Sequence, residues 1–188
     1  MALTPSTMVP LGSAAPDFRL PDVVRGQSVA FQDFADKKAL LVMFICRHCP
    51  YVVHVQDELA RLGRDYGARG VAIVAISAND AVSHPDDAPE GLRRQARDAG
   101  FSFPYLYDES QAVARAYGAA CTPDFFLFDG DRRLVYRGQL DDSRPGNGKP
   151  VTGRDLRAAL DATLTGQRAA DPQRPSAGCN IKWKSNGR

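Results

Sequence analysis

The feature that most constrains this chain is a pair of cysteines, Cys46 and Cys49, placed directly after an apolar run. Residues 39–45 are apolar at every position, which is typical of a central strand covered on both faces. From residue 49 to 66, apolar side chains recur at helical spacing. Two thiols three residues apart, between a strand and a helix, can close into a small reversible disulfide. This context favours a redox pair over one half of a metal site.

Strand and helix patterns alternate along the rest of the chain. The predicted strands cover residues 29–31, 39–45, 71–76, 103–108, 124–129 and 134–140. The predicted helices cover residues 49–66, 90–99, 111–117 and 154–164, and Thr152 is placed to cap the last of them. This order indicates an α/β fold, with a central mixed β-sheet and helices on both of its faces.

The length of 188 residues fits one folded domain with short additions at its ends. We expect a loose N-terminal arm over residues 1–15, the domain itself over 16–165 and a C-terminal extension over 166–188. The extension is polar and basic. It is therefore either flexible or an arm that folds back onto the domain.

The composition argues against several classes of function. A net charge of +2 gives no reason to expect nucleic acid or a membrane surface as a partner. No apolar stretch reaches the roughly 20 residues of a spanning helix, and residues 1–15 lack the pattern of a signal peptide, so we expect a cytoplasmic protein. Four cysteines are too few for a disulfide scaffold of this size. No glycine fingerprint for a dinucleotide follows a predicted strand, so we expect no cofactor and a separate thiol or protein as electron donor.

The residues around the first thiol are suited to lower its pKa. We predict Cys46 as the nucleophile, because a thiolate at the start of a helix faces unpaired backbone N–H groups. Arg47 adds a fixed positive charge, and His48 adds one that titrates near neutrality. Cys49 is then the resolving thiol, and Pro50 is tolerated because N–H groups in the first helical turn have no partner in the helix.

Three short motifs in this order resemble the thioredoxin superfamily, and more closely its peroxiredoxin-like branch of alkyl hydroperoxide reductases and thiol-specific antioxidants. They are Ala15-Pro16-Asp17-Phe18, the segment that ends in Cys46-Arg47-His48-Cys49, and Tyr117-Gly118-Ala119-Ala120-Cys121-Thr122-Pro123. The resemblance covers residues 12–165 and implies a thioredoxin-like fold. It also implies that Pro123 is cis beside the reactive cysteines, and that Thr122 offers backbone groups to a bound substrate strand.

The sequence departs from the peroxiredoxin pattern at two positions. Counting back from Cys49, Val42 and Cys46 stand where that family carries a Pro and a Ser or Thr. The hydroxyl that would hold a peroxide is therefore missing. A thiol–disulfide oxidoreductase acting on protein or small-molecule disulfides and dithiols is the favoured hypothesis. The alternatives are a hydroperoxide-reducing thiol peroxidase and a non-enzymatic module that binds a metal or a partner.

Two further cysteines, Cys121 and Cys179, are candidate accessory thiols. If Pro123 lies at the active site, Cys121 is near it and is either exchange-competent or a buried strand-end thiol. Cys179 is in the polar extension, close to the only tryptophan of the chain, Trp183. It is either a resolving thiol or part of a structural anchor. Because the four cysteines provide only one short-spaced pair, we predict no metal site.

Overall fold

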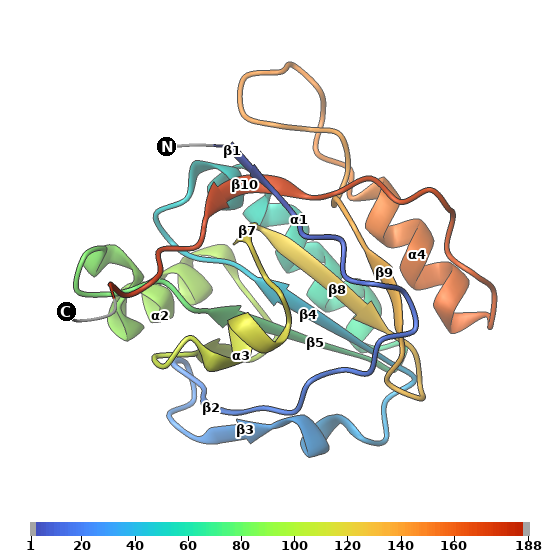
Figure 1. Ribbon diagram of the computed structural model, residues 1–188, viewed down its shortest axis with the longest axis horizontal. Coiled ribbons are helices and arrows are strands. Elements are labelled where there is room, and N and C mark those ends of the chain that lie inside the picture. The colour runs from blue at the N-terminus through green and yellow to red at the C-terminus, as the bar shows by residue number, and fades with distance from the viewer. Residues whose placement is uncertain (1–2, 186–188) are drawn as a thin grey trace.

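The core of the protein is a five-stranded mixed β-sheet, seen in a computed structural model that describes residues 3–185 (Figure 1). The spatial order of its strands is β6-β5-β4-β8-β9. Strands β4, β5 and β6 are parallel, and β8 and β9 are antiparallel to their neighbours. The strand bounds are Ala39–Phe44 for β4, Val71–Ser77 for β5, Tyr105–Tyr107 for β6, Asp124–Phe128 for β8 and Leu134–Arg137 for β9.

Helices cover both faces of this sheet, as the sequence predicts. They are α1 (Pro50–Gly67), α2 (Pro89–Ala99), α3 (Ala112–Ala116) and α4 (Arg154–Leu164). Apolar residues of α1, α2 and α4 share one core cluster with one side of the sheet. Residues of α3 and of a small hairpin, β2 (Arg19–Pro21) with β3 (Ser28–Ala30), share a second cluster with the other side. The fold is a thioredoxin-like α/β fold.

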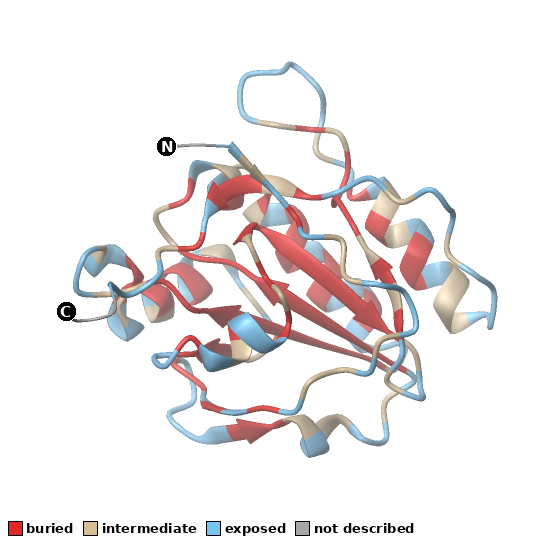
Figure 2. Ribbon diagram, in the orientation of Figure 1, coloured by how far each residue is buried: buried red, intermediate tan, exposed pale blue. Residues whose placement is uncertain are grey.

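Strand β4 explains why the sequence before the cysteines is apolar without interruption. Leu41 and Met43 pack into the first cluster, whereas Leu40, Val42 and Phe44 pack into the second. All six residues of the strand are buried, and the central strands are buried throughout in Figure 2. A strand covered on both faces has no position at which a polar side chain reaches water.

The two ends of the chain meet in a second sheet. Its strand order is β1-β10-β7, with β1 at Leu3–Pro5, β10 at Ala177–Asn180 and β7 at Cys121–Thr122. The expectation that residues 1–15 form a loose arm is therefore wrong at Leu3–Pro5, because these residues form β1 and pair with β10. The C-terminal extension folds back, and β10 crosses the top of the domain in Figure 1.

The start of α1 and the N-cap residue of α4 differ from the sequence-based expectation. Helix α1 begins at Pro50, with Cys49 as its N-cap residue. Helix α4 begins at Arg154, but its N-cap residue is Gly153 and not Thr152. Two short 3₁₀ helices, Phe31–Phe34 and Pro85–Asp87, complete the described elements. Within residues 3–185, no helix combines the length and the apolarity needed to cross a lipid bilayer.

Candidate active site

The two thiols of the Cys46–Cys49 motif lie at the point where β4 leads into α1. Both cysteines are fully buried. The prediction that Cys46 stands at the helix start is wrong, because the chain remains irregular until Pro50 and Cys49 occupies the N-cap position. Proline is favoured at the first helical position, so Pro50 was the sequence signal for this boundary. The first turn of α1 therefore lies next to Cys49, whose carbonyl oxygen accepts the N–H groups of Val52 and Val53 over 3.0 Å each.

Cys49 is surrounded by groups that stabilise its thiolate. The thiol of Cys46 donates a hydrogen bond to it, and the thiol and backbone N–H of Cys179 do the same. The Cys46 hydrogen bond is the largest influence, and together these donors outweigh burial and lower the pKa of Cys49 to about 4. When Cys49 is protonated, its Sγ lies 3.2 Å from the Thr122 carbonyl oxygen and can donate to it.

Cys46 has the opposite shift. Its hydrogen bond to Cys49, its burial and the negative charge of Asp87 raise the pKa of Cys46 well above its ordinary value. The Sγ atom lies 3.5 Å from Thr122 Oγ1 and 3.9 Å from His48 Nδ1. The hydrogen bond that the two thiols share thus favours the thiolate on Cys49 and the proton on Cys46. The sequence-based assignment places the thiolate on Cys46, and it stays a prediction.

The two residues between the cysteines are held by a loop that precedes α2. The guanidinium of Arg47 donates to Asp86 over 2.7 Å, so its charge is paired with a surface carboxylate. The ring Nδ1 of His48 is hydrogen-bonded to the carboxylate of Asp87. That bond raises the pKa of His48, although burial opposes it. The prediction that both residues tune the first thiol thus meets a geometry in which each has an acidic partner.

Asp87 is a site residue that the sequence analysis missed. It is fully buried, and its Oδ1 accepts the backbone N–H groups of Arg47 and His48 over 2.8 Å and 3.0 Å. Asn79 Nδ2 donates to Oδ2 over 2.8 Å. Burial alone would raise the pKa of Asp87, but the hydrogen bonds from His48 and Asn79 outweigh it and lower the pKa. Nothing distinguishes Asp87 from the other aspartates of its Pro- and Asp-rich loop in the sequence.

The same residues form a group of metal-type donors. The Cys46 Sγ atom, His48 Nδ1 and a carboxylate oxygen of Asp87 lie within 4.8 Å of one another, which is the only such group among residues 3–185. This set differs from the four thiolates weighed in the sequence. His48 Nδ1 and Asp87 are already hydrogen-bonded to each other, so these two residues form an ion pair that lies beside the Cys46 thiol. His84 stacks on His48 with ring centroids 4.7 Å apart.

The segment with the cis proline lies against both thiols. The Thr122–Pro123 peptide bond is cis, as the resemblance implied. The backbone of Thr122 is paired with Cys179 of β10, so the chain's own extension fills the place expected for a substrate strand. Cys121 is fully buried, with its Sγ 3.6 Å from the Pro123 carbonyl oxygen. Burial, with the nearby Asp124 carboxyl, raises the pKa of Cys121 and disfavours its thiolate.

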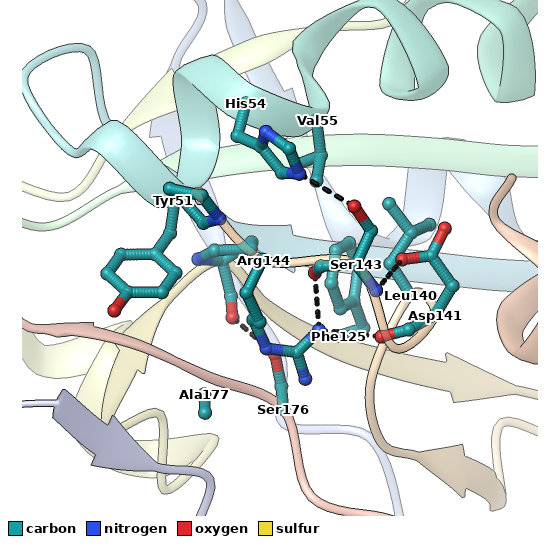
Figure 3. A pocket seen from close by; sticks show the side chains of 12 residues that line it. Tyr51, His54, Val55, Phe125, Leu140, Asp141, Ser143, Arg144, Ser176 and Ala177 are labelled. Carbon is teal, nitrogen blue, oxygen red and sulfur yellow. Dashed lines mark hydrogen bonds between the residues drawn. The ribbon is translucent and has the colours of Figure 1, made fainter. Parts of the chain in front are cut away.

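A narrow pocket opens beside Pro123 (Figure 3). One wall comes from α1, where His54 Nε2 lies 2.7 Å from Ser143 Oγ. A second wall is the loop after β9, in which the Arg144 guanidinium donates to the carbonyl oxygens of Asp141 and Ser143. The pocket's volume of about 10 Å³ has room for about one water molecule, and neither Cys46 nor Cys49 lines it.

A thioredoxin-like fold that carries two neighbouring thiols between a central strand and a helix defines a thiol-based oxidoreductase of the thioredoxin superfamily. The chain belongs to the Redoxin family, whose model matches residues 10–156. It is 30% identical over 141 residues to the thiol-disulfide oxidoreductase ResA of Geobacillus kaustophilus, covering 73% of this chain and 75% of that protein.

Two solved structures match nearly the whole chain. An uncharacterized conserved protein from Geobacillus kaustophilus has a TM-score of 0.97 and 55% identity, covering 100% of this chain and 99% of the other. A hypothetical protein from Sinorhizobium meliloti 1021 has a TM-score of 0.95 and 52% identity, covering 97% and 100%. These two proteins thus share the fold of this chain over nearly their full length, including the C-terminal extension that folds back.

Proposed function

We propose that this protein is a thiol–disulfide oxidoreductase in which Cys49 carries the attacking thiolate and Cys46 is the resolving thiol. The observation that carries the proposal is the position of Cys49 at the N-cap of α1, with both sulfurs lying against Thr122. The directions of the pKa shifts support it, because the pKa of Cys49 is lowered and that of Cys46 is raised. A thiolate is the nucleophile of disulfide exchange. The relative named thiol-disulfide oxidoreductase ResA supports this class of chemistry.

The exchange proceeds in two balanced steps. The Cys49 thiolate attacks one sulfur of a substrate disulfide, forms a mixed disulfide and releases the other substrate sulfur as a thiolate. Cys46 then attacks Cys49 Sγ, its proton passes to the departing substrate sulfur, which leaves as a thiol, and a Cys46–Cys49 disulfide remains. The substrate gains two electrons, and the enzyme returns to the dithiol when a separate thiol or protein donates two electrons.

The same steps in reverse oxidise a dithiol substrate. A stabilised thiolate favours the reduced enzyme, so its disulfide becomes a stronger oxidant. The low pKa of Cys49 therefore favours the oxidising direction. Disulfide- or dithiol-containing proteins and small thiols are the substrate class that we propose.

The loop that holds Arg47 and His48 supports this chemistry by positioning. Asp87 fixes both backbone N–H groups, and these two residues are the whole link between Cys46 and Cys49. A fixed link keeps the two sulfurs at the separation from which a disulfide forms. We therefore propose Arg47, His48 and Asp87 as positioning residues.

Equilibration in glutathione buffers tests the proposal. The expected result is a Cys46–Cys49 disulfide whose population follows the buffer potential. If no such disulfide forms at any ratio, the proposal fails. The two roles are separated by trapping. In a Cys179→Ser background, Cys46→Ser should accumulate a mixed disulfide on Cys49, and Cys49→Ser should not. The opposite pattern would restore Cys46 as the nucleophile.

A second function, reduction of hydroperoxides, is favoured by the position of Cys49. A thiolate at a helix N-cap is also the reactive group that a thiol peroxidase uses, and Cys49 occupies the position that matches the peroxidatic cysteine of the branch. The absence of a Ser or Thr at residue 46 opposes this function. Peroxide added to the reduced protein separates the two, because a peroxidase oxidises Cys49 far faster than peroxide oxidises free cysteine.

A further inference from the structure

The C-terminal strand occupies the surface on which a substrate strand is expected. β10 pairs antiparallel with β7, with Cys179 opposite Thr122 and Asn180 opposite Cys121. On its other side β10 pairs with β1, where Leu3 is opposite Cys179. Strand addition at an exposed sheet edge is a general mode of peptide binding. Here the edge that carries Thr122 is already filled by the chain itself.

Cys179 reaches the active thiols from this strand. It is 2% exposed, and it shares a core cluster with Cys46 and Cys49. Its thiol and its backbone N–H are both hydrogen-bonded to Cys49. Cys49 thus has a sulfur neighbour on each of two sides, Cys46 from its own motif and Cys179 from the extension.

The strand is fitted closely to the cis-proline segment. A Cβ atom at Gly178 would lie 2.0 Å from the Thr122 carbonyl oxygen, so only glycine allows this approach. Ser176 Oγ donates to the Pro123 carbonyl oxygen over 2.6 Å. The neighbouring Ile181 is buried, and its backbone N–H donates to Ala120. These contacts on both sides of Cys179 therefore fix the position of Cys179 relative to Cys49.

We propose that Cys179 is a third redox thiol, which takes the disulfide over from Cys46. The Cys179 thiol loses its proton and attacks Cys49 Sγ in the Cys46–Cys49 disulfide. A Cys49–Cys179 bond forms, the Cys46–Cys49 bond breaks, and the released Cys46 thiolate takes up a proton. No electrons enter or leave the protein. The inference rests on the proposed function because its starting point is the Cys46–Cys49 disulfide.

Oxidation of the active pair removes one obstacle to this attack. Burial, and then the hydrogen bond and the charge of Cys49, raise the pKa of Cys179 to about 12 in the reduced protein. Cys49 loses its negative charge when it enters a disulfide. Cys179 therefore ionises more readily when there is a disulfide to attack than in the reduced protein.

The exchange links the oxidation state of the thiols to the access of a substrate strand to Thr122. In the Cys49–Cys179 form the extension is covalently fixed over Thr122 and Pro123, and Cys46 is released as a free thiol. In the reduced form only hydrogen bonds and packing hold β10 in place. An extended protein substrate then needs β10 to leave, and this movement is open only to the reduced enzyme or to the Cys46–Cys49 form.

Peptide mapping of the oxidised full-length protein tests the inference. Cleavage after Lys and Arg, except before Pro, places the four cysteines in four different peptides, residues 39–47, 48–61, 116–132 and 169–182. In glutathione buffers, wild type should give 48–61 linked to 39–47 and also to 169–182. Cys46→Ser should give only the 48–61 to 169–182 link.

The outcomes separate the two proposals. If wild type links 48–61 only to 39–47, and Cys46→Ser carries glutathione on Cys49 with no link to 169–182, the inference is overturned and the proposed function stands. If no link involving 48–61 forms in either protein, both fail. A link from 48–61 to 169–182 in both proteins supports the inference.

A variant that leaves every thiol in place tests the role of the strand. Gly178→Ala forces β10 away from Thr122, so the Cys49–Cys179 link should fall about tenfold or more relative to Cys46–Cys49. The matched control is Asn180→Ala, an exposed position of the same strand, which should keep the wild-type ratio. Trp183 packs on Arg115, with the guanidinium carbon 4.4 Å from the ring centroid, so its fluorescence reports the displacement. An unchanged ratio in a displaced Gly178→Ala strand would overturn the inference.

Discussion

The carboxylate of Asp87 accepts hydrogen bonds from both the ring Nδ1 and the backbone N–H of His48, although 39 residues separate the two in the sequence. The same carboxylate accepts the N–H of Arg47. One buried acidic side chain thus holds the whole link between the two thiols. The shape of the dithiol motif depends on a loop that carries no cysteine.

Replacement of Asp87 should therefore cost more stability than replacement of its neighbour. Asp87→Ala leaves buried donors and the His48 charge without a partner, and we expect a loss of about 3 kcal/mol in the free energy of unfolding. Asp86→Ala removes only a pair whose carboxylate is 68% exposed, and should cost less than about 1 kcal/mol. Urea unfolding of both variants measures the difference. Equal losses would contradict the assigned role of Asp87.

The titration of His48 provides a pH-dependent test of the same contact. The Asp87 hydrogen bond raises the pKa of His48 above its ordinary value of 6.5. The resulting stabilisation is fully present below about pH 6.5 and is lost as the pH rises through the folded-state pKa. Asp87→Asn should lower the His48 pKa towards its ordinary value, measured by NMR of the imidazole protons. A His48 titration that is unchanged in this variant would rule out the ion pair.

Asp124, at the start of β8 behind the cis proline, should make stability fall with increasing pH. Burial raises the pKa of Asp124 from 3.8 to about 6, although backbone N–H groups oppose it. The folded state binds this proton more tightly, so about 3 kcal/mol of stability is lost as the pH rises from about 4 to about 6. Unfolding of wild type and Asp124→Asn at several pH values measures the effect. If the stability difference between the two is constant across this range, the prediction is wrong.

The ionisation of the thiols should differ sharply along the chain. With a pKa of about 4 while β10 is in place, Cys49 is a thiolate throughout the neutral range, and the ultraviolet thiolate absorbance should not vary between about pH 6 and pH 8. Cys121, buried and with a raised pKa, should be the last thiol modified. Ultraviolet thiolate absorbance should be lost in Cys49→Ser and kept in Cys121→Ser. Loss in the second variant instead would place the charge elsewhere.

Much of the fold follows from local patterns. The strand that ends in Phe44 and the helix that begins at Pro50 are readable because their apolar side chains follow the period of each structure. The strands β7 and β10 were not predicted. They contain only two and four residues, and small or polar side chains such as Gly178 and Asn180 give no strand pattern. Their pairing depends on contacts between distant parts of the chain.

Only the parts of the site that form short sequence motifs were predictable. The spacing of Cys46 and Cys49 marks a redox pair, and the Thr122-Pro123 motif places a second segment beside it. The sequence did not indicate which of the two cysteines is favoured as the thiolate, because this depends on the exact start of α1 and on which sulfur accepts hydrogen bonds. The role of Asp87 could not be predicted from the sequence for a similar reason. A buried and an exposed aspartate look alike in a loop without periodicity.

The packing of α1 gives a last test, because the helix contains two glycines in different surroundings. A Cβ atom at Gly63 would lie 2.7 Å from Ser102 Oγ and 2.8 Å from Phe103 Cδ1, so Gly63→Ala should destabilise the protein by about 1–3 kcal/mol. At Gly67 no atom outside the neighbouring residues and the local helix backbone lies within 4 Å of that position, so Gly67→Ala should stabilise the protein by up to about 1 kcal/mol. Urea unfolding followed by circular dichroism measures both. Since both changes raise helix propensity, opposite signs identify the contact with Ser102 and Phe103 as the cause, and a gain in both would show that these side chains move aside.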